Sequence, residues 1–413
     1  MRSIILPELA VAPTGPNPTP RVEGLYIHVP FCFHKCHYCD FYSIVDPPDK
    51  SGDRQEQFAE RLIEELDFRA GKAHLRPRTV FVGGGTPTIL RAGLWRGILG
   101  KLGNLGALDG VEEFTVEANP ETVTAEMAQT LREGGVNRMS IGCQSFDAAL
   151  LKTLERWHDP RSVTTAVETA RAAGIKNINL DLIFAIPGQT LPELDADLEA
   201  ALVLEPQHLS CYGLTYEPNT PMTRRLSLGL FRPAPEELER DMYARIMDRL
   251  AASGFEHYEI SSWAASAFEP RNSIPMPRAS RPEPSPYRCR HNLLYWTNAD
   301  WLGIGPSAAS HIGGYRWKND PHLGRYLKGS PPPTIDHEHL SPTQSIGEIL
   351  MLGLRMPEGV RLDWIECHTD RTDPRHPVMD ELVELGMLER TDTHLRLSHE
   401  GLFVADSVIG KLL

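Results

Sequence analysis

Six short apolar segments recur along the first half of the chain, and each has the length of a buried strand. They are residues 25–29, 79–82, 113–117, 138–142, 177–184 and 208–214. Amphipathic stretches with helical periodicity lie between most of them or follow the last one, at 54–70, 124–133, 160–173, 191–203 and 235–252. Strands that alternate with helices indicate a parallel sheet built from right-handed βαβ units. The pattern therefore predicts an α/β fold, a partial TIM-like (β/α)6 barrel that falls short of closure.

The second half of the chain follows a different pattern. A further strand is expected at 255–260, and the six prolines and four arginines of residues 266–288 predict an insertion loop. A glycine-punctuated stretch at 301–318 leads into a hairpin. Helices near 343–355 and 376–386, then two short strands and a terminal helix, resemble an α+β winged-helix domain. That module lacks a basic cluster, so we interpret it as a packing appendage rather than a DNA reader.

These patterns divide the chain into five predicted parts. They are a disordered lead at 1–22, the partial barrel at 23–262, a Pro/Arg-rich insertion loop at 263–290, an extension at 291–342 and the winged-helix-like domain at 343–413. The lead is rich in proline, and Glu8 interrupts its short apolar run, so it lacks the apolar region of a secretory signal.

The charge balance narrows the range of functions. Lys and Arg number 42 against 55 Asp and Glu, a formal net charge of −13, and no basic stripe is present for nucleic acid. No stretch approaches the roughly 20 apolar residues that a membrane span needs. We therefore expect a cytoplasmic protein with no nucleic-acid partner and at most transient, peripheral contact with a membrane.

Three of the seven cysteines stand together directly after the first predicted strand. Cys32, Cys36 and Cys39 have the spacing C-x3-C-x2-C, and three thiolates on one short loop can bind three irons of a [4Fe-4S] cluster. The fourth iron would stay open for a chelating ligand. A zinc site and a disulfide are the competing interpretations, although a disulfide is unusual in a reducing cytosol. Histidines that could complete a zinc site are His28, His34 and His37.

A glycine run and several polar residues stand near the ends of later strands. Gly83, Gly84 and Gly85 follow the second strand, where they either let a ligand approach the backbone or form a plain βα turn. The polar residues are Glu117, Gln144, Arg156 and Asp181. Because the carboxyl ends of parallel strands meet at one face, we expect these side chains to converge there. A charge inside an apolar strand is costly without a partner, which favours a function for Asp181.

Together these motifs resemble the radical S-adenosylmethionine (SAM) superfamily, and within it the oxygen-independent coproporphyrinogen III oxidase family. YIHVPFC, GGGTP, EANP, GCQSF, RWH, DLIFAIPGQT and HNLLYW occur in family order over about residues 24 to 320. The resemblance implies a [4Fe-4S] cluster on the three cysteines, with SAM bound beside it. The residues that it implies for SAM binding are Tyr26, Tyr38, Gly84, Gly85, Thr86, Glu117, Gln144, Arg156 and Asp181.

Two features resemble the haem-chaperone branch of that family, HemW, more than the oxidases. The oxidases carry a fourth cysteine two residues after the third, and here that position is Phe41. Residues 291–296, HNLLYW, are similar to the HNxxYW motif of HemW. The resemblance thus implies a chaperone that binds haem and passes it to respiratory or other acceptor haemoproteins. An oxidase that decarboxylates coproporphyrinogen III through SAM-radical chemistry is the alternative.

The haem ligand is open at this stage. His291 could ligate haem iron, since imidazole is a good axial ligand, or it could belong to a structural hydrogen-bond cluster ahead of an aromatic strand. Cys289 is a second candidate ligand. Cys143 and Cys211 fall in predicted strands and are expected to be buried as small apolar residues. The arginines of the insertion loop could meet haem propionates or an acidic partner.

Overall fold

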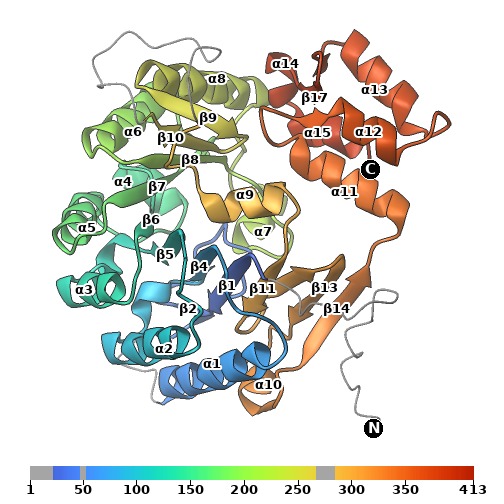
Figure 1. Ribbon diagram of the computed structural model, residues 1–413. Coiled ribbons are helices and arrows are strands. Elements are labelled where there is room, and N and C mark those ends of the chain that lie inside the picture. The colour runs from blue at the N-terminus through green and yellow to red at the C-terminus, as the bar shows by residue number, and fades with distance from the viewer. Residues whose placement is uncertain (1–21, 47–52, 267–283) are drawn as a thin grey trace, which may run out of the picture.

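The computed structural model describes residues 22–46, 53–266 and 284–413, and one twelve-stranded sheet dominates it (Figure 1). Residues 1–21 of the predicted lead at 1–22 and most of the predicted insertion loop at 263–290 lie outside these residues, whereas Val22 is buried in the core. The strand order is β14-β13-β12-β11-β1-β4-β5-β6-β7-β8-β10-β9. Its parallel centre consists of β1 (Gly24–Val29), β4 (Thr79–Gly84), β5 (Glu113–Ala118), β6 (Arg138–Gln144), β7 (Asn177–Phe184) and β8 (His208–Gly213). The predicted partial (β/α)6 barrel is therefore confirmed.

Helices cover the outer face of these parallel strands (Figure 1). The longer ones are α1 (Arg54–Ala70), α2 (Ala92–Asn104), α3 (Ala125–Glu133), α5 (Arg161–Ala172), α6 (Leu191–Val203) and α8 (Glu236–Ala252). The shorter ones are η1 (Pro87–Ile89), η2 (Pro120–Thr122), α4 (Ala148–Thr153) and α7 (Pro221–Ser227). In the part of the chain that the structure describes, each helix is too short or too polar to cross a lipid bilayer.

The two faces of the parallel strands differ in polarity. The outward residues, such as Val80, Val116 and Leu180, belong to one large apolar core shared with the helices. The inward residues are largely polar, because side chains alternate across a strand. Inward polar residues include Thr79, Glu113, Thr115, Glu117, Arg138, Ser140, Asn179, Asp181, His208 and Ser210. The interior of the barrel is thus a polar chamber that can hold a site.

Further strands extend the sheet at both edges. Beyond β1 lie β11 (Trp301–Ile304), β12 (Ala309–Ile312), β13 (Tyr315–Asn319) and β14 (Thr334–His339), and beyond β8 lie β10 (Ser262–Ala265) and β9 (Phe255–Glu259). The predicted hairpin is present as β12–β13, and Gly313 and Gly314 turn it with φ of 58° and 80°. Short elements beside the sheet are β2 (Phe31–Cys32), β3 (Ile44–Val45) and α10 (Leu323–Lys328).

The HNLLYW segment forms a helix, α9 (Arg290–Trp296), and does not lead into an aromatic strand as the sequence suggested. It crosses the space between the two ends of the sheet (Figure 1). Its backbone is anchored by the first residue of β5: Glu113 Oε2 accepts from the Arg290 N–H (3.0 Å) and Oε1 from the His291 N–H (3.1 Å). A long-range carboxylate acceptor therefore favours a helix start where local sequence alone did not indicate one.

The C-terminal residues form a second, smaller core. The elements are α11 (Pro342–Gly353), β15 (Val360–Arg361), α12 (Leu362–His368), α13 (Arg375–Glu384), β16 (Leu388–Arg390), β17 (His394–Leu397), α14 (His399–Leu402) and α15 (Ala405–Gly410). Leu350, Met379 and Leu395 are among its buried residues. The order helix, helix, hairpin, helix matches the expectation, with β15 and α12 in addition. The exact domain limits given above stay predictions.

Candidate functional site

The three clustered cysteines lie on the loop that follows β1, at the carboxyl end of the parallel strands. Cys32 ends β2, and the Cys39 N–H donates to the Cys36 carbonyl over 3.2 Å, which folds the loop into a tight turn. All three thiols are free and partly buried. The Thr86 N–H donates to the Phe31 carbonyl over 2.7 Å and ties this loop to the glycine run.

Two hydrogen-bond donors point at the thiol sulfurs. Thr86 Oγ1 donates to Cys32 Sγ over 3.6 Å, and Arg156 Nη1 donates to Cys36 Sγ over 3.6 Å. Burial raises the pKa of the Cys32 thiol and raises that of Cys39 to about 11. Donors aimed at sulfur, together with a bound cation, stabilise thiolates against this cost of burial. The loop can therefore hold a cluster whose irons are ligated by the three thiolates.

The alternatives to a cluster find little support in the loop. The disulfide alternative is absent, because all seven cysteines are free. The His28 imidazole is hydrogen-bonded through Nδ1 to the Tyr26 hydroxyl and through Nε2 to the Tyr42 carbonyl. His34 stacks on Trp157 with ring centroids 4.0 Å apart. Among the described residues no three His, Cys, Asp or Glu side chains converge on one metal ion, whereas a cubane gives each thiolate a separate iron.

Along three of the parallel strands one residue alone is half-buried while the others are fully buried, and each is a residue that the sequence singled out. These are Tyr26 in β1, Glu117 in β5 and Gln144 in β6. Asp181 is likewise half-buried in the middle of β7. Gln144 has a φ of 62°, a left-handed conformation that bends the chain as β6 ends. The structure thus places these four side chains on the inner face of the barrel.

The glycine run is needed by the protein's own packing as well as by any ligand. Gly84 has a φ of 105°, and a Cβ there would lie 2.5 Å from the His28 ring. A Cβ on Gly85 would lie 2.6 Å from the Phe31 carbonyl oxygen. The Gly84 N–H donates to Glu117 Oε2 over 3.3 Å. The run therefore packs between the cysteine loop and the acidic residue of the next strand.

Two carboxyl groups in the chamber differ in their surroundings. Burial, and then the nearby Asp181, raises the pKa of Glu117 to about 8, so this group is largely protonated at neutral pH. Asp181 accepts from Ser140 Oγ (3.0 Å) and Asn179 Nδ2 (2.8 Å), and burial raises its pKa as well. A neutral carboxyl can donate a hydrogen bond, so the chamber offers both donors and acceptors to a polar ligand.

Arg156 is a partly buried cation that forms no ion pair with the acidic residues that the structure describes. Nη2 donates to Asn119 Oδ1 (3.0 Å) and to the Gly142 carbonyl (2.5 Å), and within the described ranges the buried Nε has no hydrogen-bond partner. A guanidinium with a buried, unpaired N–H group is suited to bind a ligand carboxylate. Tyr38, also singled out, packs beside Arg156 against an apolar group that includes Ile183.

A cavity of about 290 Å³ joins part of this set to α9. Its lining is Tyr26, Phe41, Phe81, Gly84, Glu117, His291, Asn292 and Tyr295. Phe81 stacks on Tyr26 (6.3 Å between ring centroids) and on His291 (5.2 Å), so one wall is a run of rings. Sequence reasoning missed Phe81, although its alternation with Val80 and Val82 could have marked it as inward-facing.

Both ring nitrogens of His291 have partners. Nδ1 lies 2.7 Å from Thr79 Oγ1, and Nε2 lies 2.9 Å from the Tyr295 hydroxyl. Burial, and then the charge of Arg138, lowers the pKa of His291 to about 3, which keeps the ring neutral. Cys289 Sγ donates to Glu113 Oε1 (3.5 Å), and burial raises its pKa to about 12. Cys289 thus lies among buried residues and does not line the cavity.

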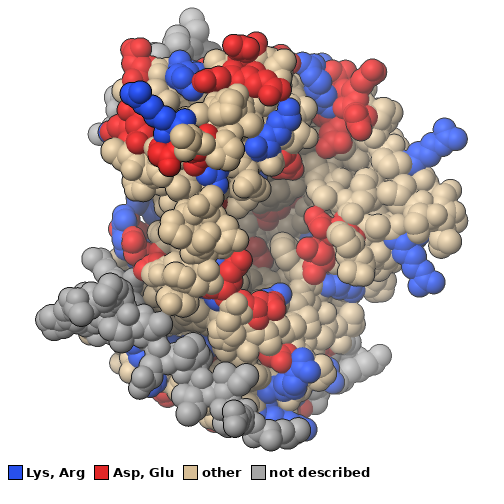
Figure 2. All heavy atoms as spheres, turned by 90° about the vertical axis from the view of Figure 1, so that its right-hand side faces the viewer, with Lys and Arg blue, Asp and Glu red and all other residues tan. Residues whose placement is uncertain are grey.

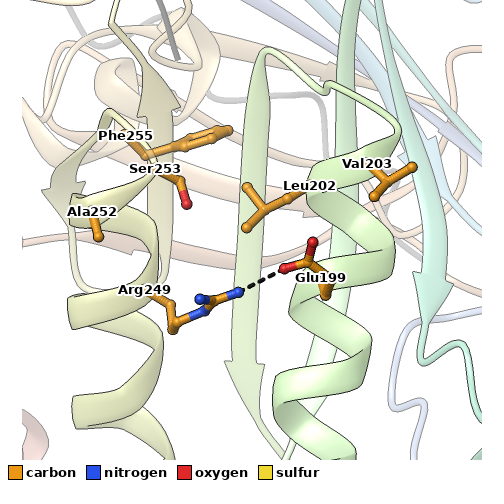
Figure 3. Close-up of a pocket in the computed structure, with 7 residues that line it drawn as sticks. All are labelled: Glu199, Leu202, Val203, Arg249, Ala252, Ser253 and Phe255. Atoms are coloured by element: carbon orange, nitrogen blue, oxygen red, sulfur yellow. Dashed lines mark hydrogen bonds and ion pairs between the residues drawn. The ribbon is translucent and has the colours of Figure 1, made fainter. Parts of the chain in front are cut away.

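Two other features carry less chemistry. A cavity of about 300 Å³ lies between α6 and α8, and its polar pair Glu199 and Arg249 is an ion pair at 2.7 Å (Figure 3). It contains none of the predicted site residues. Of the four arginines at 266–288, Arg288 is described, and it pairs with Glu256 (2.6 Å) and Glu358 (3.4 Å) instead of lining the cavity beside α9. Figure 2 shows a hollowed face with acidic side chains inside the hollow.

Comparison with known proteins defines the family. The Radical SAM superfamily matches residues 26–201, and the HemN C-terminal domain matches residues 340–404. Proteins named heme chaperone HemW are similar over nearly the full chain. That of Lactococcus lactis is 34% identical, covering 95% of this chain and 98% of its own, and that of Bacillus subtilis is 33% identical, covering 95% and 99%. HemW of Escherichia coli is 31% identical, covering 94% and 97%.

The fold has a solved counterpart. The structure of coproporphyrinogen III oxidase (HemN) from Escherichia coli, described as a radical SAM enzyme, superposes with a TM-score of 0.76 at 20% identity, covering 95% of this chain and 90% of that one. This likeness establishes the common architecture. The family follows from the sequence relatives: the chain belongs to the heme chaperone HemW family of radical SAM proteins.

Proposed function

We propose that this chain is a haem chaperone, which binds haem at the cavity beside α9 and passes it to acceptor haemoproteins. The observation that carries the proposal is the cavity itself, because it joins the barrel residues Tyr26 and Glu117 to His291 and Tyr295 of the HNLLYW helix. The relatives that match nearly the whole chain are named heme chaperone HemW, and this supports haem as the ligand. Seven free thiols suit a reducing cytoplasm, where we place the protein.

A [4Fe-4S] cluster and SAM are the proposed resident cofactors. Cys32, Cys36 and Cys39 would ligate three irons, and the group would supply an open iron and a source of single electrons. Arg156 would bind the SAM carboxylate, since its guanidinium has no acidic partner among the described residues. The remaining proposed SAM contacts are Tyr26, Tyr38, Gly84, Gly85, Thr86, Glu117, Gln144 and Asp181.

The cavity suits part of a flat, largely apolar ligand. Its volume of about 290 Å³ is at the lower end of small-molecule sites, so a porphyrin would leave an edge accessible for transfer. His291 is the proposed axial ligand. Thr79 would orient Nδ1, as partners of metal-bound histidines do, while Nε2 would exchange the Tyr295 hydroxyl for iron. The ring is neutral, so no proton competes for that nitrogen.

The oxidase alternative is less favoured. The position of the oxidases' fourth cysteine is occupied by Phe41, whose side chain has no group for proton or hydrogen-atom transfer. The structural likeness to HemN concerns the fold alone.

The test is a titration of the anaerobically reconstituted protein with haemin, followed by the Soret band. We expect saturable binding in the wild type, loss of the ligated spectrum in His291→Ala and its retention in Tyr295→Phe, which removes the competing hydroxyl. No saturable binding in the wild type would refute the chaperone proposal. Retention of the spectrum in His291→Ala would refute the ligand assignment alone. Formation of protoporphyrinogen from coproporphyrinogen III, SAM and reductant would favour the oxidase.

A further inference from the structure

Phe41 is an exposed aromatic side chain that lines the cavity. It is 61% exposed, whereas phenylalanine is one of the residues most often buried. It lines the same cavity as Tyr26, His291 and Tyr295. When a ligand covers a large apolar ring at the edge of a cavity, the free energy of binding becomes more favourable, because apolar surface is removed from water.

The backbone of Phe41 is fixed to the cysteine loop. Lys35 Nζ donates both to the Phe41 carbonyl and to Ser43 Oγ, the second over 3.0 Å. A backbone hydrogen bond also joins Phe41 to Cys39. The backbone of Phe41 therefore has a defined position, and the residue belongs both to the loop of the proposed cluster and to the wall of the proposed haem site.

The chemistry of the cavity indicates which ligand would cover this ring. Phe81 contributes an aromatic face and stacks on both Tyr26 and His291, whereas Glu117 is largely uncharged at neutral pH. Tyr26, Gly84 and Glu117 are also proposed SAM contacts, so the part of the lining left for a second ligand is the ring-rich part, with Phe41, Phe81, His291 and Tyr295. That part suits a broad, flat, aromatic ligand.

We propose that Phe41 contacts the tetrapyrrole ring directly, and so selects a flat macrocycle independently of its metal. The inference rests on the proposed haem function and adds a residue to it. A contact with the ring differs from iron ligation in one measurable respect: it acts equally on haem and on the metal-free macrocycle.

The experiment compares the binding of haemin and of metal-free protoporphyrin IX to the full chain with reconstituted cluster. Absorbance reports the first ligand, and quenching of porphyrin fluorescence reports the second. Phe41→Ala should weaken both by a similar factor of about ten, which corresponds to about 1.4 kcal/mol. Phe41→Leu keeps apolar bulk without a flat ring and should weaken both by about threefold. The matched control is Phe33→Ala, an exposed ring (44%) on the same loop that does not line the cavity, and it should bind like the wild type.

The outcomes separate the inference from the function on which it rests. Failure of the wild type to bind haemin contradicts the chaperone proposal. Normal haemin binding by both wild type and Phe41→Ala overturns the inference and leaves the function standing. A loss for haemin alone, or an equal loss in Phe33→Ala, also overturns it. If Phe41→Ala contains less iron than the wild type, the Phe41→Leu variant is used instead. Wild-type iron content together with unchanged binding of both ligands in Phe41→Leu would overturn the inference.

Discussion

Replacement of Glu113 tests whether one buried carboxylate holds the HNLLYW helix in place. Glu113 is 4% exposed and accepts the backbone N–H groups of Arg290 (3.0 Å) and His291 (3.1 Å). Each hydrogen bond to a buried charged acceptor contributes on the order of 1.5–3 kcal/mol. The carboxylate also lies near Arg138, whose buried guanidinium would lose a compensating charge. We expect Glu113→Ala to lower the free energy of unfolding by about 3–5 kcal/mol, and Glu113→Gln, with one acceptor oxygen, by less.

Hydrogen exchange followed by mass spectrometry is the appropriate assay, because a chain with two cores is not expected to unfold in a single step. In Glu113→Ala, peptides that contain α9 should lose protection while those of α3 keep it. Haemin affinity should fall with the protection of α9.

The neighbouring residue provides a matched control. Glu112 forms exposed ion pairs with Arg78 (2.8 Å) and Arg290 (2.6 Å), so Glu112→Gln should cost no more than about 1 kcal/mol. Equal protection of α9 in Glu113→Ala and Glu112→Gln would refute the assignment of Glu113 as the anchor of this helix.

Three further predictions concern residues of the chamber. Glu117 has a pKa raised from 4.5 to about 8, so the folded chain binds the extra proton and the stability of the barrel should fall as pH rises between these values; Glu117→Gln should flatten that dependence in the urea transition of the larger core. Gly84→Ala should lower the thermal midpoint, since it combines a strained φ of 105° with a clash against His28. Arg156→Lys should weaken SAM binding about tenfold in equilibrium dialysis, because an ammonium cannot form the bidentate fork.

Each of these three predictions has a result that would contradict it. An unchanged slope of stability against pH in Glu117→Gln would assign the dependence to other acids. Gly188→Ala has a φ of 87° and open space around its Cβ, so an equal loss there would show that strain alone, and not the contact with His28, limits Gly84. Wild-type SAM affinity in Arg156→Lys, with normal iron content, would contradict the carboxylate assignment.

The six parallel strands of the barrel could be predicted from the sequence, but the polarity of their inner face was not. Segments such as 113–117 were interpreted as apolar runs, and the structure shows strict alternation, with Phe114 and Val116 in the core and Thr115 and Glu117 inside the barrel. Runs of this kind contain the period-2 signal of a strand with one polar face. Attention to that period would have predicted a polar chamber.

Helix α2 was missed for a different reason. It contains four glycines, at 93, 97, 100 and 103, each of which lowers helix propensity. Trp95, Ile98 and Leu102 nevertheless recur at helical spacing and are buried against the sheet. Burial of this face outweighs the cost of the glycines, which only tertiary packing reveals.

The sequence predicts those parts of the candidate site whose residues are close together along the chain. It does not predict the parts that depend on partners far away in the sequence. The cysteine spacing and the glycine run could be recognised along the chain. The position of α9 could not, because Glu113 and Thr79, its partners, precede it by 177 and more residues. The contact of Phe41 with the cavity was hidden likewise: the sequence marked this residue only as the replacement of a cysteine.

A chain of hydrogen bonds joins the start of α9 to Asp181 inside the barrel, and the neutral state of His208 determines the direction of the bonds that its ring forms. The Cys289 N–H donates to the Tyr258 hydroxyl (3.0 Å), which is then free to donate to His208 Nε2 (2.8 Å). Burial lowers the pKa of His208 well below its usual value, so the neutral ring can donate only from Nδ1, to Asn179 Oδ1 (2.6 Å). Asn179 Nδ2 donates in turn to Asp181 (2.8 Å). Protonation of His208 would turn Nε2 into a donor and reverse the bond to Tyr258, whose O–H would lose its acceptor, while the bond from Nδ1 to Asn179 would keep its direction. The hydroxyl that accepts the Cys289 N–H at the start of α9 therefore has all its partners only while that imidazole is neutral.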